Sequence, residues 1–430
     1  MYNSPDNQHL LAIVTKIAKD LVAHYDQLSN YGGLYSSKIG LALFLADYTL
    51  HTQDKQFEEV IYQSVTDCLE NIDPSQGLSL SGVAGIGWGI NYLVSRGIFD
   101  KSEVEEYLSK LQHVVISSID LPHEAQNHDL MHGFIGKVLF IIAQYHLGFA
   151  SRETLVNVIR KSLQYLKETA IQSETGMAWK YTTHQHMEYS LGLSHGQPAI
   201  IVYLCEVLSL NLLSDEENQE VRTMIDHIAQ WLMDKRTVND EQKLLYPQSL
   251  YIDRDPHLFK RLAWCYGDPG MAIGFVNAGK TLKNDTYFQE GKALILQAAE
   301  LPLEQSRIMV NPKNPSEIDM GFCHGVVGVL HMFHRFAQVF DDEVFHKSRT
   351  YWLNVMLQNT QPKAPYMGWK GTKAEDAATE DDGTSFRWVS KSTLLEGAAG
   401  MGMVLLHDFL MPPTQGLQWD HFFYTDLTNL

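Results

Sequence analysis

The chain has few cysteines, few basic residues and no long apolar run, and each of these shortages narrows what the protein can be. Only four cysteines occur in 430 residues, which is the pattern of a protein from a reducing compartment. No apolar run reaches the roughly 18 residues that a bilayer-spanning helix needs. The amino terminus, MYNSPDNQHL, is polar and lacks an apolar signal core. We therefore expect a cytoplasmic protein with no direct membrane insertion.

Basic residues are outnumbered, with 33 Lys and Arg against 51 Asp and Glu and a formal net charge of −18. Nucleic acid binding requires a basic surface, so we expect no nucleic acid partner. Part of the acidic charge lies in residues 375–382, EDAATEDD. A solvated loop is the favoured interpretation of this segment, and a docking site for a basic partner is the alternative.

What the chain does have is an internal repeat. Seven times a Gly or small residue is followed, three residues later, by another Gly or small residue and then by an apolar run. The anchor residues are Ser37, Gly82, Gly133, Gly196, Gly267, Gly325 and Gly397. They are 45 to 72 residues apart, which is enough for two helices and their loops. Length alone would favour two or three domains, but the repeat predicts a single domain over residues 1–430.

Each repeat contains two kinds of helical pattern. The run after each anchor is apolar nearly all round, as in a buried helix. The stretches between these runs are amphipathic, as in Thr154–Lys167 and in Ser214–Lys235, where a Ser cap and an acidic first turn precede the apolar positions. One buried and one amphipathic helix per repeat predicts an all-α fold, an α/α toroid with seven inner and seven outer helices.

A polar side chain precedes the anchor in repeats two to seven. These residues are Ser81, His132, His195, Tyr266, His324 and Glu396. If every inner helix starts at the same end of the toroid, they converge on one cavity mouth, and a cavity rimmed by a few polar groups is the usual form of a ligand site.

The fifth and sixth repeats add a metal-ligand pattern to this ring of residues. Cys265 and Cys323 each precede the ring position by one residue, and His324 follows Cys323 directly. Two thiolates and one imidazole leave one tetrahedral position of a zinc ion open, which distinguishes a catalytic zinc site from a structural one. The alternative is two buried cysteines and a hydrogen-bonded core histidine. Cys68 and Cys205 lie in helical patterns and are expected to be free thiols.

Several motifs resemble one known family. The glycine frame, WCYG at 264–267, CHG at 323–325, SHG at 194–196 and Asp129 four residues before Gly133 resemble the LanC family of lanthipeptide (lantibiotic) cyclases. The resemblance runs from Ser37 to Gly397. It implies an α/α toroid and a zinc enzyme that adds Cys thiols of a precursor peptide to dehydroalanine or dehydrobutyrine of the same peptide, forming thioether rings.

The resemblance also implies partners for an enzyme of antibiotic biosynthesis. They are a dehydrated precursor peptide with leader and core, a lanthipeptide dehydratase, and a transporter whose complex would bring the enzyme to the membrane. The alternative is a LanC-like zinc protein that binds glutathione or adds it to dehydrated proteins. A prenyltransferase-like toroid is disfavoured, because both sulfur ligands are cysteines in glycine-led repeats. A non-catalytic scaffold is disfavoured, because an open zinc site would have no use in it.

The family's site residues transfer to matching positions of this sequence. Cys265, Cys323 and His324 would be the zinc ligands; the catalytic residues would be His195, Asp129, Arg261 and Tyr266. His132 is an additional titratable group that the family pattern does not explain.

These residue types suit the chemistry. A thiol attacks as its thiolate, and attack on a dehydro residue places negative charge on an amide oxygen, which Arg261 or Tyr266 would stabilise. His195 has a pKa range suited to protonating the α-carbon, and Asp129 would orient it.

Local alternatives remain for several of these positions. Asp129 would cap a helix that starts near Met131, His195 would be a packed histidine, and Trp264 and Tyr266 would be rim aromatics. His331 and His334 are expected to be packing histidines without a carboxylate partner. Ala178–Thr183 is polar and rich in β-formers, which predicts a hairpin.

Overall fold

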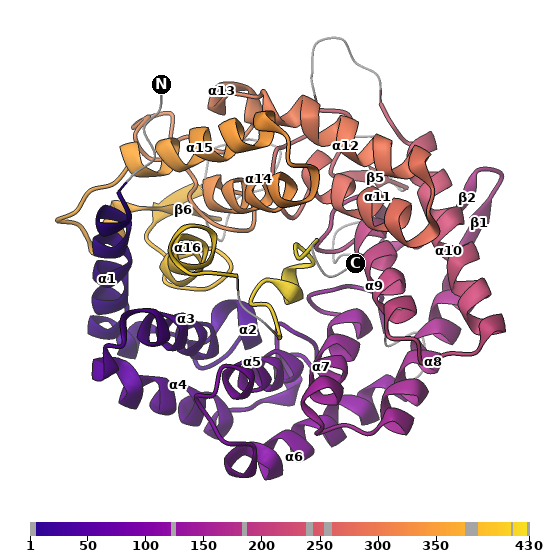
Figure 1. Ribbon diagram of the computed structural model, residues 1–430, viewed down its shortest axis with the longest axis horizontal. Coiled ribbons are helices and arrows are strands. Elements are labelled where there is room, and N and C mark those ends of the chain that lie inside the picture. Colours follow the sequence, from indigo (N-terminus) through magenta and orange to yellow (C-terminus); the bar gives the residue numbers. More distant parts are fainter. Residues whose placement is uncertain are drawn as a thin grey trace.

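The protein is a closed double ring of helices. The computed structural model describes residues 6–121, 126–182, 187–237, 244–252, 260–374, 386–413 and 416–427. Figure 1 looks down the axis of the ring and shows an inner circle of helices surrounded by an outer one. The inner helices are α3 (Lys38–Thr52), α5 (Val83–Ser95), α7 (Phe134–Leu147), α9 (Gln197–Ser209), α11 (Asp268–Leu282), α14 (Val326–Phe340) and α16 (Ala398–Leu405). The predicted α/α toroid is confirmed.

The seven anchors of the sequence repeat are the N-cap residues of the seven inner helices. Gly267 shows why glycine is needed at this place, because its φ is +92° and a Cβ atom there would lie 2.0 Å from the carbonyl oxygen of Arg261. In the six inner helices other than α3, whose N-cap is Ser37, a glycine lets the helix start against the loop that precedes it.

Each outer helix packs its apolar face against the inner ring and exposes its polar face to solvent. They are α1 (Asn7–Ala23), α4 (Glu58–Glu70), α6 (Lys101–Ile119), α8 (Arg152–Thr169), α10 (Asp215–Asp234), α12 (Asp285–Ala299) and α15 (Glu343–Gln358). Both amphipathic stretches singled out in the sequence form such helices. Ser214 caps α10 in a capping box with Glu217, as the Ser cap and acidic first turn predict. One hydrophobic core joins buried residues of both rings with Trp419, Phe422 and Phe423 near the end of the chain.

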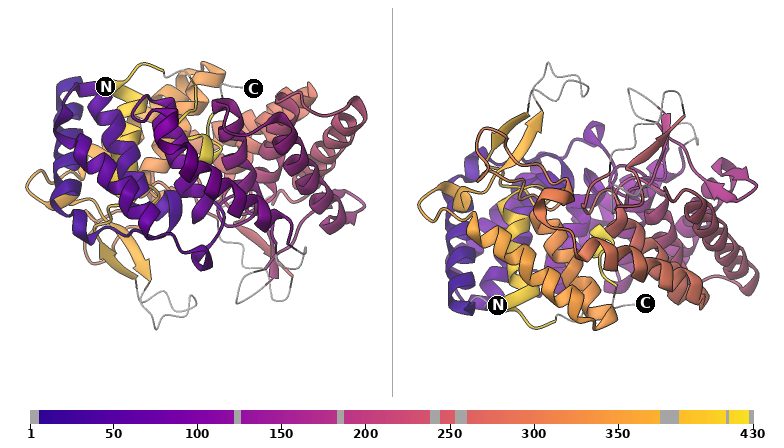
Figure 2. Two further views of the ribbon diagram at one scale, coloured as in Figure 1. Left: turned by 90° about the horizontal axis from the view of Figure 1, so that it is seen from below. Right: turned by 90° about the horizontal axis from the view of Figure 1, so that it is seen from above.

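Short elements occupy the loops. Two single-turn helices are α2 (Gly33–Ser36) and α13 (Leu303–Ser306). The antiparallel strands are β1 (Ile171–Ser173) with β2 (Gly176–Ala178), β3 (Tyr181–Thr182) with β4 (Met187–Ser190) and β5 (Ser249–Tyr251), and β6 (Gly371–Ala374) with β7 (Phe386–Val389). All of them lie in segments that lead into inner helices, and Figure 2 shows the β6–β7 pair projecting from one end of the toroid.

Two sequence expectations fall partly or wholly outside the described residues. The hairpin expected at Ala178–Thr183 is instead divided between two sheets, because β2 ends at Ala178 and β3 covers Tyr181–Thr182. Thr183 and the acidic residues 375–382 lie outside the described residues. Among the described helices, none combines the length and the apolarity that a bilayer crossing demands.

The chain returns to the centre of the ring after its last inner helix. The π-helical turn η6 (Leu406–Leu410) continues α16, and residues 416–427 then run through the middle of the toroid, where they appear in yellow in Figure 1. This segment, hereafter the C-terminal segment, contains the short 3-10 helix η7 (His421–Phe423). Trp419, Phe422 and Phe423 are fully buried in it.

Candidate functional site

The loops that precede the inner helices are joined to one another around one end of the toroid. Hydrogen bonds run from loop to loop: Leu34 N to Leu80 O, Ser81 N to Met131 O, Ser194 Oγ to Cys265 O, Cys265 N to Cys323 O, Cys323 N to Leu395 O and Leu395 N to Tyr35 O. The N-termini of the inner helices therefore share one end, as the ring of polar residues requires.

The predicted metal ligands meet at this end. Cys265 lies two residues before the cap of α11, and Cys323 and His324 directly precede the cap of α14. Their ligand atoms lie within 4.8 Å of one another, and among the described residues no other group of three or more His, Cys, Asp or Glu is arranged in this way. The backbone N–H of Cys265 donates to the carbonyl of Cys323 over 3.1 Å, which holds the two loops together.

Asp319 orients His324, a contact that the sequence pattern did not identify. His324 Nε2 lies 3.1 Å from a carboxylate oxygen of Asp319, and the other carboxylate oxygen accepts the backbone N–H of Gly321 over 2.9 Å. With Nε2 paired to the carboxylate, Nδ1 is the nitrogen left for a metal. A carboxylate on the second nitrogen is the usual support of a metal-bound histidine. The run Asp-Met-Gly-Phe-Cys-His-Gly at 319–325 contained the signal.

The electrostatics of the cluster favour a cation. A hydrogen bond shared with Cys265, together with burial, raises the pKa of the Cys323 thiol. Burial alone would lower the pKa of His324, but the Cys323 thiolate and the Asp319 carboxylate raise it to about 10. Two sulfur atoms and one imidazole within 4.8 Å are a donor set that fits zinc.

The predicted acid–base pair forms beside this cluster. Nδ1 of His195 lies 2.6 Å from Oδ2 of Asp129, whose carboxylate is buried. Oδ1 of Asp129 accepts the backbone N–H groups of Met131 and His132 over 2.6 and 2.9 Å. The helix-cap alternative for Asp129 is wrong, because α7 begins at Phe134 and its N-cap residue is Gly133.

Two aromatic rings stack on the imidazole of His195. The ring of Tyr181 stacks on that of His195 with 5.4 Å between the ring centroids. The ring of His132 also stacks on it, with 5.7 Å between the centroids and an interplanar angle of 8°. Nδ1 of His132 is in turn 2.7 Å from Oγ of Ser81. Three members of the polar ring, Ser81, His132 and His195, are therefore in contact in series.

The charges of the pair favour a protonated His195. Burial by itself lowers the pKa of His195, but the charge and hydrogen bond of Asp129 outweigh it and raise that pKa above its ordinary value. Burial opposes ionisation of Asp129, yet the nearby His195 holds the pKa of this carboxyl well below its usual range. His132 behaves differently, because its burial lowers its pKa. The pKa values of the two stacked histidines are thus shifted in opposite directions.

Tyr266 and Arg261 belong to the loop that carries Cys265. Tyr266 packs against the loop of His195, since a Cβ atom on Gly192 would lie 2.8 Å from its ring. Burial and the two cysteines raise the pKa of the Tyr266 phenol, which keeps it a neutral hydrogen-bond donor. Arg261 is partly exposed, and its backbone carbonyl oxygen lies close to Gly267. Trp264 is not a rim aromatic: it is fully buried, and its Nε1–H donates to the carbonyl of Phe423 over 2.8 Å.

The expectation that His331 lacks a carboxylate partner is wrong. Its Nδ1 and Nε2 lie 3.0 Å from Asp408 and 3.0 Å from Asp420, and the imidazole is fully buried. His334 lies 3.8 Å from Asp408 as well. Both carboxylates come from far along the chain, so the local sequence around the histidines does not show them. They tie α14 to the C-terminal part of the chain.

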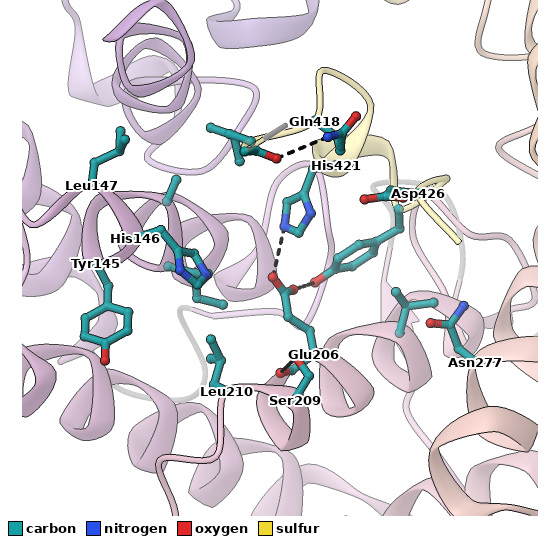
Figure 3. Close-up of a pocket in the computed structure, with 16 residues that line it drawn as sticks. Tyr145, His146, Leu147, Glu206, Ser209, Leu210, Asn277, Gln418, His421 and Asp426 are labelled. Carbon is teal, nitrogen blue, oxygen red and sulfur yellow. Dashed lines mark hydrogen bonds and ion pairs between the residues drawn. The ribbon is translucent and has the colours of Figure 1, made fainter. Parts of the chain in front are cut away.

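A separate cavity of about 560 Å³ opens near the far ends of α7 and α9 (Figure 3). It is lined by Tyr145, His146, Glu206 and Leu210 from those helices and by residues of the C-terminal segment. His421 Nε2 pairs with Glu206 over 2.9 Å. None of the residues that the sequence predicts for the site lines this cavity.

Comparison with known proteins shows which family the chain belongs to. The solved structure of a nisin cyclase superposes with a TM-score of 0.65 over 96% of this chain and 97% of its own, at 16% sequence identity. An unsaturated glucuronyl hydrolase from Streptococcus agalactiae gives a TM-score of 0.46 at 11% identity, over 94% of this chain and 92% of its own. No curated relative matches the sequence. The family model described as lanthionine synthetase C-like protein matches residues 30–421, so the chain belongs to the lanthionine synthetase C-like family.

Proposed function

We propose that this protein is a zinc-dependent lanthipeptide cyclase, which adds Cys thiols of a dehydrated precursor peptide to dehydroalanine or dehydrobutyrine in the same peptide. One observation carries the proposal. In a chain of this family, an open two-sulfur, one-nitrogen cluster lies at the same toroid end as a His195–Asp129 pair. In this proposal the enzyme works in the cytoplasm beside the dehydratase that makes its substrate and a transporter that exports the product.

Cys265, Cys323 and His324 would hold the zinc ion, with Asp319 fixing the imidazole. Zinc with an open position binds a peptide thiol and lowers its pKa, which supplies a nucleophile at neutral pH. Side chains around the cluster act in the later steps, in which the enolate forms and then gains a proton.

Attack of sulfur on the β-carbon of a dehydro residue moves an electron pair onto the amide oxygen as an enolate. The Tyr266 phenol stays protonated and donates a hydrogen bond to that oxygen, and Arg261 supplies positive charge from the same loop. The enolate must then gain a proton at its α-carbon. His195 gives this proton from Nε2, because its Nδ1–H is held by Asp129. The stacked rings of Tyr181 and His132 keep the imidazole in this orientation.

The glutathione alternative needs a cluster of basic side chains for the carboxylates of the tripeptide. Among the described residues next to the zinc ligands, Lys260 does not provide one, because it is 5% exposed and its Nζ donates to the carbonyl of Leu244 over 2.8 Å. This leaves Arg261 as the cation of that loop. The cyclase therefore remains the better proposal, and its two reacting groups gain from being on one peptide.

The test uses a dehydrated, Cys-containing precursor peptide in the presence of glutathione. We expect the peptide to lose free thiols without change of mass when the zinc-loaded protein is added. Mass spectrometry after thiol alkylation measures both quantities. A glutathione adduct as the main product, with the peptide's own cysteines still open to alkylation, would replace the cyclase by the glutathione alternative.

A further inference from the structure

The C-terminal segment is buried although most of it is irregular. Asp420, Phe422, Phe423, Thr425 and Leu427 are all 0% exposed. A loop in such a place must satisfy its polar groups within the protein, because water does not reach them. The partners of this segment therefore show what it holds together.

Side chains from the surrounding inner ring bind the segment at both ends. Arg335 of α14 makes two hydrogen bonds to the carboxylate of Asp420, over 2.9 and 2.7 Å, and His331 of the same helix makes another over 3.0 Å. Lys280 of α11 donates to the carbonyl of Leu427 over 3.0 Å. These contacts fix the segment relative to the two helices, α11 and α14, that follow the cysteine loops.

Phe423 lies between the two cysteine loops themselves. Its ring stacks on Phe322 at a centroid distance of 4.0 Å and meets Trp264 edge to face at 4.9 Å. Its carbonyl accepts the Nε1–H of Trp264 over 2.8 Å. Trp264 and Phe322 are the residues directly before Cys265 and Cys323. A single residue of the C-terminal segment thus contacts the neighbour of each sulfur ligand.

We propose that Phe423 is a positioning residue for the metal centre, and that the C-terminal segment sets the separation of the two cysteines. The inference rests on the zinc site proposed above. Between the loops themselves, the Trp264 and Phe322 rings lie 5.8 Å apart, and the backbone N–H of Cys265 donates to the carbonyl of Cys323. Phe423 packs against both of these rings. Ligands held at their binding separation before the metal arrives bind it more tightly, since less freedom is lost on binding. Residue 423 lies beyond residues 30–421, which the family model covers.

Zinc affinity of the full chain tests the proposal, measured by competition with a chromophoric chelator. Phe423→Leu keeps an apolar side chain but loses the stacked ring, whereas Phe345→Leu makes the same change at an equally buried position of α15. The ring contacts of Phe345 are with Phe336 and Phe340, both in α14. We expect Phe423→Leu to weaken zinc binding at least about tenfold, which is one full unit of log affinity. Phe345→Leu should stay within about twofold of the wild type.

A gentler variant keeps the proposal testable if Phe423→Leu fails to fold. Trp264→Phe retains an aromatic ring and removes the hydrogen bond to the Phe423 carbonyl, so we expect zinc binding to weaken about threefold to tenfold. In metal-free protein, iodoacetamide should alkylate Cys265 and Cys323 faster in both variants, while the buried Cys68 stays as protected as in the wild type. Peptide mapping gives the rates.

The outcomes separate this inference from the proposed function. Wild-type protein that binds no zinc would overturn both. Wild-type protein that binds zinc, with Phe423→Leu and Phe345→Leu equal to each other in affinity and in alkylation, would overturn the positioning role alone.

Discussion

Replacing His195 by Asn separates proton transfer from the other roles of this residue. The Asn amide can donate to Oδ2 of Asp129 in place of the imidazole N–H, which lies 2.6 Å away, so the buried carboxylate keeps a partner. What is lost is the stacking on Tyr181 and His132, at about 0.5–1.5 kcal/mol for each ring pair. We therefore expect a loss of unfolding free energy of about 1–3 kcal/mol and a folded protein with unchanged zinc content.

The catalytic effect should be much larger than the effect on stability. Removing a general acid typically slows the reaction about 10²–10⁴-fold. The assay is the loss of alkylatable thiols from a dehydrated precursor peptide, followed by mass spectrometry, with circular dichroism and metal analysis on the same sample. His132→Asn is the matched control, because it removes the neighbouring ring without touching the bond to Asp129.

His132→Asn should slow ring formation less than about tenfold, since it removes orientation but leaves the proton donor in place. Ring formation by His195→Asn at the wild-type rate would refute the reasoning and would leave His195 as a packing residue. Equal losses in the two variants would also refute it, because they would show that the stack and not the proton matters.

Three further predictions concern the metal and the C-terminal segment. Cys323→Ala should lose most of the zinc measured by metal analysis, whereas Cys68→Ala, which removes a buried thiol 3.6 Å from Ser37 Oγ, should keep about one zinc per chain. Asp420→Asn breaks a buried ion pair with Arg335 and should cost about 3–5 kcal/mol of unfolding free energy in urea titrations, and an unchanged midpoint would contradict the anchoring of the segment. Burial lowers the pKa of His421, but Glu206 outweighs burial and raises this pKa to about 9, so the native state holds a proton that the unfolded chain, with a pKa near 6.5, releases. The stability that Glu206 provides should be complete below pH 6.5 and decline as pH rises through 9, by up to about 1.4 kcal/mol per pH unit. Comparing wild type with Glu206→Gln by denaturation at pH 6.5, 7.5 and 9 checks this decline, and a constant difference between the two proteins would contradict the assignment.

The sequence predicts the architecture and the proposed ligands because both depend on local constraints. An N-cap that must lie close to the loop preceding its helix selects glycine, as Gly267 shows, and six such glycines together with Ser37 reveal the repeat. Cys323 and His324 are adjacent, and Cys265 occupies the same frame one repeat earlier.

Contacts between distant segments are not accessible in this way. The carboxylates around His331 come from 77 and 89 residues further along the chain. Tyr181 contacts His195 from the two-residue strand β3, and the β-forming pattern at Ala178–Thr183 did not indicate this contact. The C-terminal segment has no helical or strand period, so its aromatic residues gave no sign of their place in the ring.

The shared direction of the inner helices also has an electrostatic consequence. Each helix carries a macrodipole equivalent to roughly half a positive charge at its N-terminus and half a negative charge at its C-terminus. The seven inner helices all start at the end where the cap loops are joined, so their positive N-terminal ends lie together there. Helix N-termini favour anions, and in the proposed reaction a sulfur anion and an enolate oxygen would form at this end. The C-terminal ends of α7 and α9 lie at the opposite end, and it is there that His421 pairs with Glu206.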